Sequence, residues 1–89
     1  MALRIVSSNI GDRQGTVIIA ADKQEEVMSA AAKQMAIAEG SKQLGRCGVS
    51  GNEVAYPVDE NGQSSEDLVL GRAGQVAEYH CEYKLTAGL

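Results

Sequence analysis

Large apolar side chains are scarce in this sequence, and their scarcity limits the core that the chain can build. Of its 39 hydrophobic residues, 12 are alanine, 22 are valine, isoleucine, leucine or methionine, and none is phenylalanine or tryptophan. A chain of 89 residues with 44% hydrophobic and 22% charged composition predicts a single domain spanning residues 1–89. Because a domain of this size buries only about two-thirds of its unfolded surface, we expect added burial between subunits and predict a homo-oligomer.

The charge balance argues against several classes of partner. Twelve acidic and eight basic residues give a net charge of -4, which disfavours attraction to nucleic acid phosphates. No stretch approaches the roughly 18 apolar residues of a membrane span, and the first residues lack the pattern of a signal peptide. We therefore predict a small acidic protein of the cytoplasm, with neither nucleic acid nor membrane as a partner.

The N-terminal half predicts a hairpin followed by a helix. Residues 3–7 and 16–21 have strand-like composition, and residues 8–14 form a long connection between them. Asp22 followed by Glu25 predicts a helix from residue 23 to about residue 39, with Gly40 and Gly45 as alternative ends. A broad apolar stripe on this helix predicts the face that packs on the sheet; it comprises Val27, Met28, Ala31, Ala32, Met35 and Ala38.

The C-terminal half predicts two more strands separated by a polar loop. Residues 53–58 alternate, and Pro57 places them near a sheet edge. Residues 75–85 form the clearest strand, with Tyr79, Cys81, Tyr83 and Leu85 on one face and His80 on the face that meets water. The whole pattern predicts an α+β fold: a mostly antiparallel sheet of about four strands, with one main helix packed on one face, in the order β-β-α-β-β.

Residues that suit contact with another protein fall into three groups. Four acids in the polar loop could present carboxylates to a basic partner surface; they are Asp59, Glu60, Glu66 and Asp67. Ile37 lies away from the main helical stripe, which makes it a candidate subunit contact. Tyr79 and Tyr83 lie on the apolar face of the last strand, and that face meets either the core or a partner. The strand's length favours pairing with another subunit.

Residues suited to catalysis or metal binding are few. His80 is the only imidazole, and Cys47 could act with it as a nucleophile only if the fold brings the two together. The alternate polar residues of the loop resemble a calcium loop, but the sixth position is Ser64 and the twelfth is Leu70 where glycine and glutamate are required. We predict no catalytic, cofactor or metal site, and reduced thiols at Cys47 and Cys81.

The order of strand, Ala-rich helix, strand and long strand, with the closing run Gly74-Gln75-Val76-Ala77-Glu78-Tyr79 through Lys84-Leu85, resembles the dodecins. The resemblance implies assembly into a hollow shell and storage of a flavin. Dodecins stack the flavin against a tryptophan. This chain has none, so the only rings available to a ligand are those of Tyr56, Tyr79 and Tyr83.

Taken together, these patterns favour a non-enzymatic protein that acts through protein-protein contacts. It is expected to be either a self-associating structural component or an accessory or inhibitory factor that binds another protein. The alternative is a small-ligand carrier with dodecin-like assembly. An enzyme that uses Cys47 and His80 ranks third.

Overall fold

An antiparallel sheet and two consecutive helices account for most of the chain in a computed structural model, which describes residues 2–72 and 74–89. The elements in order are β1 (Arg4–Ile10), β2 (Gln14–Ala21), α1 (Gln24–Val27), α2 (Ala30–Leu44), β3 (Cys47–Val49), β4 (Val54–Val58), α3 (Glu66–Val69) and β5 (Glu78–Ala87). The predicted α+β fold with a main helix on an antiparallel sheet is confirmed. No helix in the described ranges has the length and apolarity needed to cross a membrane.

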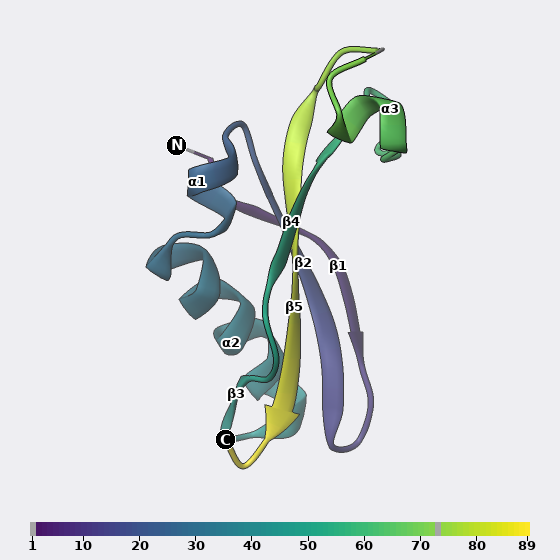
Figure 1. Ribbon diagram of the computed structural model, residues 1–89. Helices are drawn as coiled ribbons and strands as arrows, with labels where there is room; N and C mark the ends of the chain where they lie inside the picture. The colour runs from purple at the N-terminus through teal and green to yellow at the C-terminus, as the bar shows by residue number, and fades with distance from the viewer. Residues whose placement is uncertain (1, 73) are drawn as a thin grey trace.

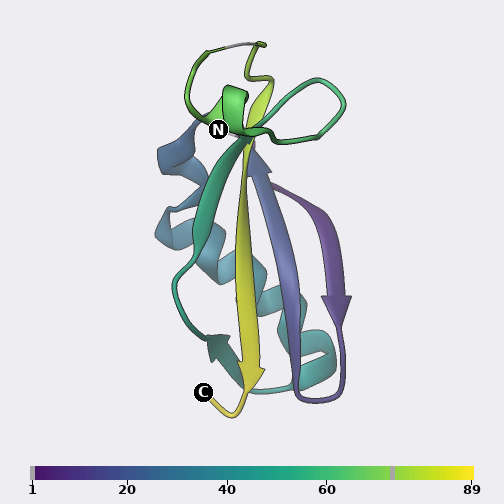
Figure 2. The ribbon, with the colours of Figure 1, turned by 45° about the vertical axis from the view of Figure 1, so that its right-hand side comes forward.

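The sheet runs in the order β1-β2-β5-β3, and β4 also pairs with β5 (Figures 1 and 2). All four pairings are antiparallel. The sheet has five strands where about four were expected, because β3 and β4 occupy the same side of β5 in succession. Residues 50–53 separate these two short strands, and the edge that they form is therefore interrupted.

The core lies between the sheet and helices α1 and α2, which cover one sheet face (Figure 1). Alternate residues of β2 and β5 point into it and are almost fully buried; they are Val17, Ile19, Ala21, Cys81, Tyr83 and Leu85. From the helices, Val27, Ala32 and Ala36 meet them. The predicted inward face of the last strand is thus confirmed, although the strand spans Glu78–Ala87 instead of residues 75–85.

The predicted single helix of residues 23–39 is wrong, because the helix is broken at Met28 and Ser29. Ser29 begins α2: its side chain accepts a hydrogen bond from the Ala32 amide at 3.2 Å and donates one to the Glu26 carbonyl at 2.7 Å. Half of the predicted stripe does face the core, namely Val27, Ala32 and Met35. Ala32, Ala36 and Gly40 are buried at spacings of four, whereas Met28, Ala31 and Ala38 of the predicted stripe are exposed. Of the two alternative ends, Gly45 is correct.

The connection between β1 and β2 is also shorter than expected. The strands end at Ile10 and begin at Gln14, so residues 11–13 replace the predicted loop of residues 8–14. The Gly11 amide donates to the Gln14 carbonyl oxygen at 2.9 Å and closes the turn. Ser8 and Asn9 lie in the edge strand β1, where polar side chains face water and do not interrupt the sheet.

Helices α1 and α2 leave one face of the sheet uncovered, and one segment extends past the end of the sheet (Figure 1). The open face is the sheet surface opposite α1 and α2. It carries Arg4, Ser7, Asn9, Thr16, Ile18, Ala20, Val54, Tyr56, Val58, Glu78, His80, Glu82 and Lys84. The arm comprises residues 59–72 and 74–77, between β4 and β5. It contains α3 and extends past the end of the sheet, so the molecule measures 41 × 23 × 20 Å (Figure 1).

Candidate functional site

One row of the open face joins side chains from four strands. Arg4, Ala20, His80 and Tyr56 are successive register partners across β1, β2, β5 and β4. Because Ala20 is small, the Arg4 guanidinium reaches over β2 to Glu78 on β5, and its Nη2 donates to both carboxylate oxygens at 2.7 Å. His80 Nε2 lies 2.8 Å from Glu78 Oε2. The Glu78 carboxylate therefore binds two basic side chains at once.

His80 is buried, which corrects the prediction that it lies on a water-facing surface. Only 9% of the residue is exposed, although it points away from the core. The Tyr56 ring from β4 packs edge-on against the imidazole with ring centres 5.9 Å apart, and the Arg4–Glu78 pair covers the other side. Sequence spacing along β5 could not reveal this cover, because Tyr56 and Arg4 belong to two other strands.

The carboxyl of Glu78 has a lowered pKa, mainly because of the hydrogen bond from Arg4 and further because of His80; burial acts in the opposite direction. A carboxyl with a lowered folded-state pKa stabilises the fold fully above its ordinary value, about pH 4.3. That stabilisation is lost as the pH falls through the folded-state pKa. The ion pair with Glu78 holds Arg4, the first residue of β1, to β5, and we expect this attachment to weaken at acidic pH.

We expect Glu78→Gln to lower the free energy of unfolding by about 1 kcal/mol at pH 7. The difference from the unmodified protein is expected to shrink as the pH falls below about 4. Urea unfolding followed by circular dichroism from pH 3 to 7 measures both. Glu82→Gln is the matched control, because Glu82 lies on the same strand and face and makes no ion pair within the described residues. An equal loss in both variants would contradict the role of Glu78.

The structure does not bring Cys47 and His80 together. Cys47 pairs with Ala87, seven residues along β5 from His80, which corresponds to about 23 Å at ~3.3 Å per residue. The Cys47 thiol lies against α2, 3.7 Å from the Ile37 carbonyl oxygen, whereas His80 lies on the open face. Both cysteines are free, and burial raises the pKa of the Cys81 thiol, which disfavours the reactive thiolate.

The four acids of the predicted contact surface lie in the arm. Asp59 Oδ1 accepts hydrogen bonds from the amides of Asn61 and Gln63 at 2.9 and 3.0 Å, which closes a local turn. Arg72 lies 3.2 Å from Glu66 and 3.6 Å from Asp67. Arg72 therefore offsets part of the acidic charge of the arm. Glu60 is exposed. Across the described ranges, no three acidic, histidine or cysteine side chains form a group able to hold a metal ion.

The remaining predicted contact residues belong largely to the core of their own chain. Tyr83 is fully buried, and its hydroxyl donates to the Val27 carbonyl oxygen at 2.6 Å. Tyr79 and Ile37 are half-buried and pack against the same core. The structure thus assigns Tyr83 to the interior and leaves only parts of Tyr79 and Ile37 at the surface.

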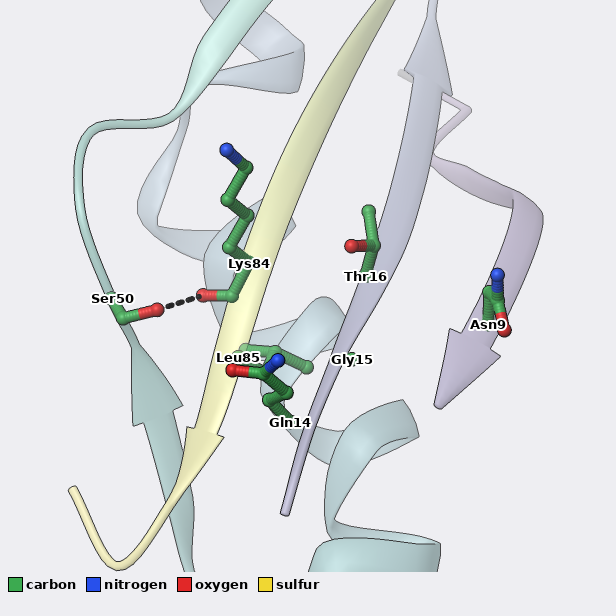
Figure 3. A pocket seen from close by; sticks show the side chains of 7 residues that line it. All are labelled: Asn9, Gln14, Gly15, Thr16, Ser50, Lys84 and Leu85. Carbon is green, nitrogen blue, oxygen red and sulfur yellow. Dashed lines mark hydrogen bonds between the residues drawn. The ribbon is translucent and has the colours of Figure 1, made fainter. Parts of the chain in front are cut away.

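A shallow polar pocket lies on the open face at the end of the sheet near the β1–β2 turn (Figure 3). Its volume is about 320 Å³, and its lining comprises Asn9, Gln14, Gly15, Thr16, Ser50, Lys84 and Leu85. None of these residues is aromatic. The three rings named as available to a ligand lie elsewhere: Tyr83 is buried, the Tyr56 ring packs on His80, and Tyr79 packs against the core.

Sequence patterns missed the exposed apolar side chains. Of the apolar run at residues 68–70, only Leu68 is buried, whereas Val69 and Leu70 are 56% and 58% exposed. Among the helices and strands, α3 contacts only β4. In the edge strand β1, Ile5 and Val6 are 38% and 39% exposed. A run of apolar residues does not by itself indicate which element would cover it.

Comparison with known proteins gives no relative: no protein-family model matches the chain, and neither a curated protein nor a solved structure shows a significant match.

Proposed function

We propose that this chain is a non-enzymatic protein that acts through protein-protein contacts, and in the first place through self-association. One observation supports this most strongly: within the described residues, more large aliphatic side chains are exposed than buried, and seven others are half-buried. Eight are exposed, namely Ile5, Val6, Met28, Val54, Val69, Leu70, Val76 and Leu89. Six are buried, namely Val17, Ile19, Val27, Val58, Leu68 and Leu85.

The imbalance has an energetic consequence. Burial of a large aliphatic side chain contributes about 1.5–3 kcal/mol, so the side chains left at the surface are a large unused share of the stabilisation available to the chain. Much of the buried set is alanine or cysteine, which contributes less. Contact with further copies would bury the exposed side chains and stabilise a domain whose own core is small.

Light scattering across a dilution series tests the proposal. We expect a mass that is a multiple of 9.4 kDa at high concentration and that falls toward one chain on dilution. The absorbance spectrum of the same sample is expected to show no visible chromophore; a bound chromophore would instead support the carrier. A folded monomer at every concentration would contradict self-association.

An accessory protein that binds a different partner is the second candidate, and the arm is the observation that favours it. The arm extends beyond the sheet (Figure 2). It carries the exposed residues Val69, Leu70 and Val76 in addition to its acidic residues. The double variant Val69→Ser, Leu70→Ser separates the two candidates. A lower oligomer mass in the double variant would indicate that the arm is a contact between copies. An unchanged mass would indicate that self-association does not use the arm, which is then available to another protein.

A further inference from the structure

The two edges of the sheet differ in how well they are protected. One edge consists of the short strands β3 and β4, is interrupted at residues 50–53, and contains Pro57. Such features prevent a further strand from pairing. The other edge is β1, seven residues long with no proline, and exposed along most of its length. A bulge at Val6, between Ile5 and Ser7, disturbs strand pairing in the first part of β1. Residues 7–10 pair regularly with β2.

The regular part of β1 presents backbone groups to solvent at alternate residues. In an antiparallel ladder, residues alternate between pairs that exchange hydrogen bonds and pairs that do not. Gly11 and Gln14 are a hydrogen-bonded pair at the turn, so by alternation Asn9 and Ser7 also bond to β2. Ser8 and Ile10 therefore direct their N–H and C=O groups outward, away from β2. A second bond gives the same result. The Ala87 amide donates to the Arg13 carbonyl oxygen, and alternation from this pair along β2 makes Gly15 and Val17 bond to β5, which leaves Thr16 and Ile18 to bond to Asn9 and Ser7 of β1.

We infer that β1 pairs with β1 of a second copy of this chain, antiparallel and across a two-fold axis at Asn9, so that two sheets become one. This inference rests on the proposed self-association and specifies its geometry. Around that axis, Ser8 of one copy faces Ile10 of the other, and the outward groups of both become bonded. Asn9 faces its own counterpart, and an amide side chain both donates and accepts, which makes it self-complementary.

The charges of the edge favour a second copy as the occupant. Arg4 is the only charged residue of β1, and Glu78 binds it on the open face. Two copies of β1 therefore meet without opposing like charges, which would destabilise cross-strand pairing. A two-fold contact uses the same surface on both chains and closes after two copies, so it leaves no exposed β1 edge.

Ser8→Pro tests the pairing, because it removes an outward N–H without removing a bond to β2. We expect the dimer dissociation constant to rise about 100-fold, since each copy loses one hydrogen bond and each bond corresponds to roughly tenfold. Ser8→Ala keeps the N–H and is expected to leave the constant within about twofold. Circular dichroism verifies that both variants remain folded. An unchanged dimer in a folded Ser8→Pro variant would overturn the pairing.

Cross-linking provides a second test that does not disturb the backbone. Facing residues that do not exchange hydrogen bonds have Cα atoms about 4.5 Å apart, within the range for a disulfide. Asn9→Cys is therefore expected to form a linked dimer on mild oxidation, and Thr16→Cys, on the neighbouring inner strand, is expected not to. A dimeric but unlinked Asn9→Cys variant would overturn the pairing while self-association stands. A monomeric unmodified protein would overturn both.

Discussion

Replacement of Tyr83 by alanine is expected to leave most of the protein unfolded at 25 °C. Tyr83 is the largest fully buried side chain, and it packs between the sheet and the helices. Truncation of a large buried ring to alanine costs about 3–5 kcal/mol. A chain of this length has about 4–13 kcal/mol of stability in all, and its small core predicts a value near the lower end. Urea unfolding followed by circular dichroism at a fixed protein concentration measures the loss.

Tyr83→Phe is the matched control for the ring itself. It keeps the buried ring and removes only the hydroxyl that donates to the Val27 carbonyl oxygen at 2.6 Å. We expect a loss of about 1–3 kcal/mol, because that carbonyl oxygen loses its partner in a buried setting. The phenylalanine variant should therefore remain folded. If both variants lost the same amount, the hydrogen bond and not ring packing would account for the stabilisation.

The sequence predicted the two central strands well, because their residues are patterned by burial. Cys81, Tyr83 and Leu85 alternate with polar residues along β5, and this alternation directly records which face meets the core. β1 shows no alternation of apolar and polar residues, because an edge strand that is exposed along most of its length can contain serine and asparagine. Its C-terminal part therefore resembled a loop, and the hairpin connection was predicted too long.

The sequence did not reveal the break in the helix, because it contains two helix-start signals of similar strength, at Asp22 and at Ser29. Asp22 and Glu25 formed a plausible start, but Lys23 and Glu26 hold the N-terminus of α1 instead, with the Lys23 amide donating to Glu26 Oε1 at 3.2 Å. Ser29 is as good an N-cap as Asp22. Alanines occupy so many positions of the helix that a rotated stripe was equally apolar, and only contact with β2 and β5 selects Ala32 and Ala36.

The polar row on the open face was beyond sequence reasoning for a different reason. Arg4 and Glu78 are 74 residues apart, and their contact depends on the order of strands in the sheet. It also depends on the small side chain of Ala20 between them. A local pattern indicates which face a residue shares with its chain neighbours, but not which strand lies beside it. His80 was accordingly placed on the correct face with the wrong burial.

Gly40→Val is expected to destabilise the fold by about 1–3 kcal/mol, although glycine is ordinarily a poor residue inside a helix. Gly40 is buried in α2 where the helix crosses β5, and a Cβ atom there would overlap the Leu85 side chain and approach Cys47 Sγ at 3.6 Å. Leu85 is itself buried and has little space to move. The larger side chain must therefore push the helix away from the sheet.

Ala38→Val is the control, because it places valine on the exposed side of the same helix. Its cost is expected to be only the difference in helix propensity, about 0.6 kcal/mol. Urea unfolding gives the free energy of unfolding of both variants. The loss in Gly40→Val measures the cost of overlap with Leu85, and the loss in Ala38→Val measures the cost in helix propensity. A gain in stability from Gly40→Val would show that α2 can move away from Leu85 freely. A loss several times that of Ala38→Val would show that the close approach at Gly40 fixes the position of the helix on the sheet.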